Sequence, residues 1–136
     1  MASVFRLEHK NKKYEFPTFY LKKFLPVSPY NIDEVISSEL LKKKYGDVFN
    51  EINVLHSSNE EFPTPFKDGL EDIFTEEFFC GCPSIDKLYD WFFNTEEWLR
   101  IGFVIREYKV KKRYISKSKK QCIFHYENII SRKIIS

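Results

Sequence analysis

The residue types best suited to chemistry in this chain are three cysteines and one histidine, Cys80, Cys82, Cys122 and His125. Thiolates and imidazoles are the usual ligands of structural zinc sites. The spacing argues against such a site, because a two-residue step between cysteines is tighter than the usual zinc motif. Cys122 and His125 are three apart, so on a strand they would point to opposite faces. We expect buried free thiols, no metal and no other cofactor.

Two further sets could support catalysis. Cys80 or Cys82 could act as a nucleophile near the start of a helix, but the sequence places no base beside either thiol. Arg6, Glu8 and His9 lie together near the N-terminus. A charged first strand followed by distant hairpins is also the order of small ADP-ribosyltransferase cores. Those enzymes need a glutamate late in the chain, where this sequence has Lys119, Lys120 and Gln121. We therefore expect no catalytic residues.

A basic segment is the strongest feature that could contact a partner. It combines closely spaced cations with an aromatic side chain, in the set Lys111, Lys112, Arg113, Tyr114, Lys117, Lys119 and Lys120. Such a segment could follow a nucleic-acid backbone or dock on an acidic protein groove. The alternative is a charged edge that keeps a sheet from aggregating.

An acidic and aromatic region precedes it, between residues 51 and 77, where Lys67 is the only lysine or arginine. A connection of this length in a compact domain is often functional, although a solvated loop is the alternative. Its candidate contact residues are Glu60, Glu61, Phe62, Phe66, Glu71 and Asp72. An acidic face combined with a basic segment is typical of a protein-binding inhibitor more than of a pure nucleic-acid binder.

The elements that must position these residues follow from hydrophobic spacing and capping signals. Alternation predicts a hairpin from strands near residues 3–9 and 14–16, and Asn31 with Glu34 begins a helix that ends near Gly46. Ser84 caps a helix whose core face is Ile85, Leu88, Tyr89 and Phe92, with Trp91 beside it, and a short helix containing Trp98 follows. Residues 103–110 and 121–126 are predicted to pair as strands, and the apolar residues 129–135 to form an ordered last strand or helix.

Length and composition indicate one domain spanning residues 1–136. Hydrophobic residues make up 43% and aromatic residues 18% of the chain, and the net charge is only +2. No apolar run approaches the roughly 20 residues that cross a bilayer, and the N-terminus lacks the apolar segment of a signal peptide. We expect a protein of the reducing cytoplasm with no membrane partner.

Parts of the sequence resemble a loose set of small bacteriophage and prophage proteins. The similar stretches are VFRLEHK, PSIDKLYDWF, GFVIREYKV and SKSKKQCIF. In those proteins a YRxEH-like strand precedes an SLxxLxxWF helix and a GFxIxxYxV strand. The resemblance implies a shared fold and a phage accessory gene, a class that includes inhibitors of host defence such as anti-CRISPR proteins.

The sequence thus predicts an α+β domain, with a small mostly antiparallel sheet and two main helices packed on one face. We expect a phage accessory protein that acts in the infected host cell by non-catalytic binding of a host protein or ribonucleoprotein complex. Nucleic acid is a possible partner of the basic segment. The alternative function is a small nucleotide- or nucleic-acid-acting enzyme with its site around Arg6, Glu8 and His9.

Overall fold

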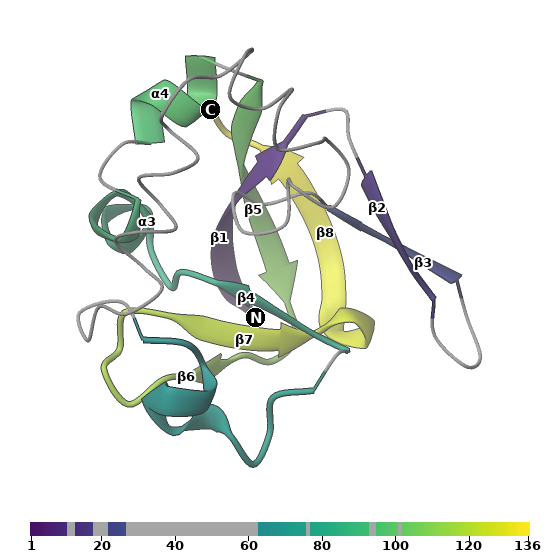
Figure 1. Cartoon of the computed structure of the whole chain (residues 1–136), viewed down its shortest axis with the longest axis vertical. Coiled ribbons are helices and arrows are strands. Elements are labelled where there is room, and N and C mark those ends of the chain that lie inside the picture. The colour runs from purple at the N-terminus through teal and green to yellow at the C-terminus, as the bar shows by residue number, and fades with distance from the viewer. Residues whose placement is uncertain (11–12, 18–21, 27–62, 76, 93–94, 101) are drawn as a thin grey trace, which may run out of the picture.

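The computed structural model describes seven stretches of the chain, with the backbone alone for the second, the third and Phe66. These stretches are 1–10, 13–17, 22–26, 63–75, 77–92, 95–100 and 102–136 (Figure 1). The helix predicted for residues 31–46 lies outside them. The packing of two main helices on one face therefore stays a prediction.

The first sheet is antiparallel and has β5 at its centre. Its strands are β1 (Ala2–His9), β5 (Phe103–Val110) and β8 (Ile129–Ile134), in the order β1-β5-β8. The predicted hairpin between residues 3–9 and 14–16 is wrong, because β1 pairs with β5 while residues 13–17 pair with residues 22–26 in a separate sheet. The C-terminal apolar residues form a strand, as one of the two predicted alternatives had it.

A separate two-stranded ribbon follows β1 in the chain. It consists of β2 (Lys13–Pro17) and β3 (Lys22–Pro26), which pair with each other antiparallel. The strand expected near residues 14–16 therefore exists, but its partner comes after it in the sequence. Local alternation identified the strand and could not identify its partner, since pairing depends on where later segments fold.

The second sheet is also antiparallel and has β7 at its centre. Its strands are β4 (Phe78–Gly81), β7 (Cys122–His125) and β6 (Tyr114–Ile115), in the order β4-β7-β6. The predicted pairing of residues 103–110 with 121–126 is wrong, because β5 belongs to the first sheet and β7 to the second. The three residues between β5 and β6 carry the chain from one sheet to the other.

The two sheets meet where β1 passes the end of β4. The amide of Phe5 donates to the carbonyl oxygen of Cys82 and the amide of Cys82 donates back to Phe5, each over 2.8 Å. In Figure 1 the strands of the second sheet run across the direction of β1, β5 and β8. One face of the first sheet is thereby placed against the second sheet.

The two helices predicted after Ser84 are present in the described residues, and the first of them begins at the predicted cap. In α3 (Ile85–Trp91) the hydroxyl of Ser84 accepts the amide of Lys87 over 3.2 Å, and α4 (Thr95–Arg100) has acidic residues in its first turn. The predicted core face of α3 is rotated, because Ile85 and Tyr89 are 37% and 39% exposed. The buried positions are Leu88, Trp91 and Phe92. A short π-helical turn, η2 (Phe66–Leu70), and a 3₁₀ turn, η3 (Tyr126–Asn128), complete the described helices.

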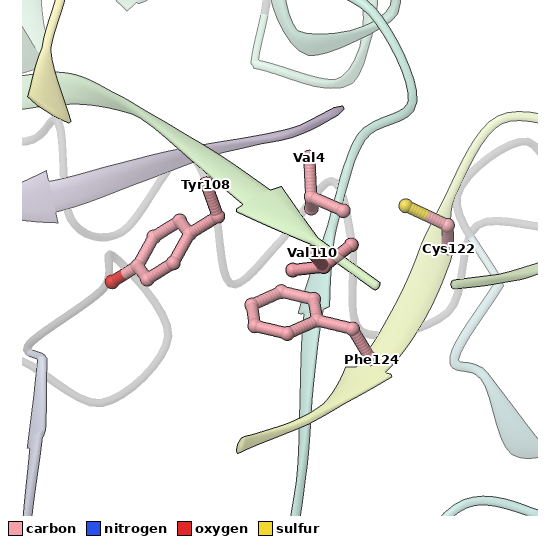
Figure 2. Close-up of a cluster of buried hydrophobic side chains, with 5 residues drawn as sticks. All are labelled: Val4, Tyr108, Val110, Cys122 and Phe124. Atoms are coloured by element: carbon pink, nitrogen blue, oxygen red, sulfur yellow. The ribbon is translucent and has the colours of Figure 1, made fainter. Parts of the chain in front are cut away.

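Two apolar layers lie on opposite faces of the first sheet. Toward the second sheet, Figure 2 shows Val4, Tyr108, Val110, Cys122 and Phe124 packed together from β1, β5 and β7. On the other face the ring of Trp98 in α4 meets Phe103 edge-on, with ring centres 4.9 Å apart.

The described residues thus confirm an α+β fold with antiparallel sheets. Within them, no helix combines the length and the apolar character needed to cross a bilayer.

Candidate functional site

The basic segment does not form one long hairpin finger. Residues 111–113 connect the two sheets, and only residues 116–121 form the turn of a hairpin, between β6 and β7. The side chains of Lys111, Lys112, Lys117 and Lys119 are exposed along this path. The exposed charge of the predicted set therefore comes from four lysines on two neighbouring connections.

The remaining members of the basic set are partly buried. The guanidinium of Arg113 donates to the carbonyl oxygens of Ser3 and Pro83, so it ties β1 to the segment between β4 and α3. Tyr114 packs against Phe78 and carries the ammonium of Lys112 over its ring, 4.7 Å from the ring centre. Lys120 is also partly buried. Arg113 supports the fold, and its charge is not freely presented to a partner.

The turn at 116–121 is held by one acidic residue of the preceding region. The carboxylate of Asp68 accepts the amide of Ser118 over 2.8 Å, its hydroxyl over 2.6 Å and the side-chain amide of Gln121 over 2.9 Å. The backbone oxygen of Asp68 accepts the amide of Lys117. The acidic region thus contacts the basic segment directly instead of forming a separate face at this point.

These hydrogen bonds also set the charge state of Asp68. Burial alone would raise the pKa of this carboxyl. The bonds from Gln121, Ser118 and Ser116 outweigh burial and hold the pKa of Asp68 below its usual value. The turn is therefore built around an ionised carboxylate at neutral pH.

The other acidic candidates fall into two groups. Glu71 and Asp72 are exposed in the turn after η2. Glu60, Glu61, Phe62 and the side chain of Phe66 lie outside the described residues. The structure consequently brings the described end of the acidic region close to the 116–121 turn.

A buried charged cluster lies on the face of the first sheet that turns toward β4. The carboxylate of Glu8 is fully buried, 2.8 Å from Nε of Arg6 and 3.0 Å from Nε of Arg106. It also accepts the hydroxyl of Tyr108 over 2.7 Å. In Figure 2 that hydroxyl points away from the other four labelled side chains, so Tyr108 has its ring in the core and its hydroxyl in the cluster.

The cluster is anchored to both sheets. Nη1 of Arg6 donates to the backbone oxygen of Cys80 over 2.9 Å, and the guanidinium carbon of Arg6 lies 5.1 Å from the ring centre of Phe79. Burial opposes the charge on Arg6, but Glu8 outweighs that effect and the pKa of Arg6 is raised above its usual value. Burial is also the main reason why the pKa of Tyr108 is raised, to about 12. The phenol is therefore neutral and donates to Glu8.

His9 is separated from Arg6 and Glu8. Successive side chains of a strand alternate between its faces, so His9 lies on the opposite face of β1. There its ring meets Phe103 edge-on, 5.3 Å between ring centres, and lies close to Gly102. The structure unites Arg6 and Glu8 but does not add His9 to their cluster.

The three thiols are buried or partly buried, as expected. Burial raises the pKa of Cys80 to about 11 and that of Cys122 to about 12, and it raises the pKa of Cys82 as well. Thiols in this state are poor nucleophiles at neutral pH. The described residues contain no group of three or more histidine, cysteine or acidic side chains able to hold a metal ion.

His125 has a different role from that of a zinc ligand. Its Nδ1 accepts the amide of Glu127 at the start of η3, and its Nε2 lies 2.9 Å from the carboxylate of Glu77. The ring also stacks on Tyr126, with ring centres 4.7 Å apart. His125 therefore caps a turn and pairs with an acid at the edge of the second sheet.

Comparison with known families gives a match over the whole chain, to the family described as bacteriophage T4 Y00F protein, across residues 1–136. The chain belongs to this family. No curated protein and no solved structure matches the sequence of this chain. The Y00F family membership supports the phage origin that the sequence patterns implied, and its description states no activity.

For this Y00F family member, the sequence did not reveal which residues complete the Arg6–Glu8 cluster or which residue holds the 116–121 turn. Arg106 and Tyr108 were part of a strand pattern, and nothing local connects them with Glu8, about a hundred positions earlier. Asp68 was one acid among several. The one available signal was strand alternation, which groups Arg6 with Glu8 and separates both from His9.

Proposed function

We propose that this phage protein acts in the infected host cell by non-catalytic binding of a host macromolecule, through the exposed lysines of the basic segment. The observation that carries the proposal is the ordered 116–121 turn, in which Asp68 fixes the backbone beneath Lys117 and Lys119. A fixed turn presents its charges with little loss of conformational entropy on binding. An acidic protein surface is the partner chemistry that such lysines complement.

The class of target follows from the resemblance to phage accessory genes. Phages use small proteins of this kind against host defence, so a component of an antiviral system is the target we propose, as for anti-CRISPR proteins. Binding of this type needs no cofactor. The alternative of a nucleotide- or nucleic-acid-acting enzyme keeps Arg6 and Glu8 as its candidate residues, without His9.

The test is capture of a host partner by tagged wild-type protein and by a charge-reversed variant. Reversing Lys111, Lys112 and Lys117 to glutamate should abolish capture of a stoichiometric partner, because like charges would then face an acidic surface. Arg113 is left unchanged since its contacts with Ser3 and Pro83 stabilise the fold.

The control variant changes three other cations to glutamate, namely Lys10, Lys87 and Arg100. It therefore alters the net charge by the same amount. This control should capture the partner as the wild type does. If the basic-segment variant still captures the partner, the proposal is wrong and Glu71 and Asp72 become the next candidates. If both variants lose the partner, overall charge and not this surface governs binding.

A further inference from the structure

The charged cluster on the first sheet has an excess of positive charge. Arg6 and Arg106 are direct cross-strand partners in the β1–β5 register. Like charges in that position destabilise a sheet, and here a single carboxylate, that of Glu8, lies between them. Buried charges with perturbed pKa values, such as Arg6, are concentrated at functional sites.

A third arginine lies at the next register position on the same face. Arg132 of β8 is directly opposite Tyr108, so its side chain is on the face that carries the Tyr108 hydroxyl. It is also a diagonal neighbour of Arg106, and such neighbours are about 7–8 Å apart, within reach of long side chains.

The charges of the cluster can be counted. The carboxylate of Glu8 pairs with Arg6 and Arg106, and Arg132 lies on the same face, opposite Tyr108. The Tyr108 phenol is neutral because its pKa is about 12. Three positive charges less one negative charge leave an excess of two among the described residues. Arg132 is the exposed member of the cluster, and the side chains of Arg106 and Arg6, which are 19% and 11% exposed, form its largely buried inner part.

We propose that Arg6, Arg106 and Arg132 form a binding site for a terminal phosphate group. A terminal phosphate carries about −1.5 to −2 charges at neutral pH, which matches the excess on the cluster. Guanidinium groups also bind phosphate oxygens in a bidentate manner, which ammonium groups cannot do. A phosphodiester backbone carries one charge per phosphate and complements the site less well. This inference does not depend on the proposed function, because the exposed lysines of the basic segment are on other elements.

Calorimetric titration of the full chain with pyrophosphate and with inorganic phosphate tests the site. We expect saturable binding of pyrophosphate. Changing Arg132→Gln should weaken it about tenfold, the loss expected for one charge-assisted contact. Arg132 is exposed, so this variant keeps the buried Glu8 contacts and should fold.

The matched control is Lys133→Gln, which removes the same charge from the next residue of β8. Lys133 lies opposite Glu107 on the other face of the sheet, and its side chain is 67% exposed. The affinity of the Lys133→Gln variant for pyrophosphate should stay within about twofold of that of the wild type, because salt screens distant exposed charges. The proposal would be overturned if Arg132→Gln and Lys133→Gln weakened pyrophosphate binding equally. It would also be overturned if neither pyrophosphate nor inorganic phosphate bound saturably.

A third arm separates the sources of phosphate. A nucleoside monophosphate should compete with pyrophosphate, while an oligonucleotide without terminal phosphates should not. Competition by that oligonucleotide at equal affinity would overturn the assignment to terminal phosphates. The variant with Lys111, Lys112 and Lys117 reversed should bind pyrophosphate as the wild type does. Loss of binding in that variant alone would move the phosphate site to the basic segment and refute the arginine cluster.

Discussion

Glu8 is the residue whose environment departs most from what its type prefers. A carboxylate is almost never fully buried unless it is paired. Here two arginines and one phenol surround it, and each of the three comes from a strand position on the same face. The arginines in turn are tolerated as cross-strand neighbours because Glu8 lies between them. Each charge in the cluster therefore depends on the others.

The first prediction changes Glu8→Gln, which keeps the side-chain volume and removes the charge. We expect a loss of roughly 3–5 kcal/mol in the free energy of unfolding, because two largely buried guanidinium groups lose their counter-ion. Urea titration measures it. The control is Glu107→Gln on the opposite face, whose partners Lys109 and Lys133 are 42% and 67% exposed. That change should cost about 1 kcal/mol or less. Equal losses of unfolding free energy in Glu8→Gln and Glu107→Gln would show that Glu8 is not the centre of a buried ion-pair network.

Residue types alone revealed two of the five residues of this cluster. Arg6 and Glu8 stood out because charges on a predicted strand need an explanation, and alternation places both on one face. His9 was grouped with them by proximity in sequence, although the same alternation places it on the other face. Arg106, Tyr108 and Arg132 join the cluster only through strand pairing, which depends on contacts between distant segments.

At the scale of elements, the 116–121 turn depends on a contact from a different element. Asp68 sits in η2 at a position followed by Gly69, whose φ of 82° favours glycine. A Cβ on Gly69 would also lie 3.2 Å from Cβ of Lys117. The two turns are thus closely packed, and the order of the basic segment depends on η2.

The second prediction changes Asp68→Asn. An amide cannot accept all the bonds from Ser118 and Gln121, so we expect a loss of roughly 1–3 kcal/mol and faster amide exchange at Ser118. Asp72→Asn is the control, because Asp72 is exposed in the neighbouring turn. This control should leave the free energy of unfolding and the rate of amide exchange at Ser118 nearly unchanged. Loss of protection in the control alone would contradict the role given to Asp68.

The contribution of Asp68 to the free energy of unfolding also depends on pH. The pKa of Asp68 is lower in the folded chain than its usual value, so its contribution is fully present above about pH 4 and is lost as the pH falls through the folded pKa. Between about pH 6 and pH 3 the wild type should therefore lose more stability than Asp68→Asn. Urea titrations at the two pH values measure the difference. Parallel losses in both proteins would show that Asp68 is not the carboxyl responsible.

Helices were easier to predict than strand pairing for a physical reason. The cap at Ser84 and the buried Leu88, Trp91 and Phe92 are local signals, separated by one or two helical turns. The residues of β1, β2, β5 and β7 were recognised as strands, but β1 was paired with β2 and β5 with β7, and β3 and β6 were not expected as strands. β4 was missed because its residues, FFCG, are short and were taken for a loop before the helix.

For the molecule as a whole, the critical point is where the two sheets join. The reciprocal hydrogen bonds of Phe5 and Cys82 continue the strand order from β1 to β4, so the sheets are linked at the middle of β1. Gly81 lies immediately before this bridge, and no side chain larger than hydrogen fits there. An added Cβ would be 2.3 Å from Cγ1 of Val4 and 3.0 Å from the carbonyl oxygen of Phe5.

The last prediction follows from that contact. Gly81→Ala should cost roughly 1–3 kcal/mol, because Val4 is fully buried and cannot move aside. The double variant Gly81→Ala with Val4→Ala removes the clashing methyl, so its loss in urea titration should be smaller than the sum of the two single losses. Ser131→Ala on exposed β8 is the control for an alanine in a strand and should change stability by no more than about 0.5 kcal/mol. Additive losses in the double variant would mean that β1 and β4 do not meet at this pair, and the joining of the two sheets would have to lie elsewhere.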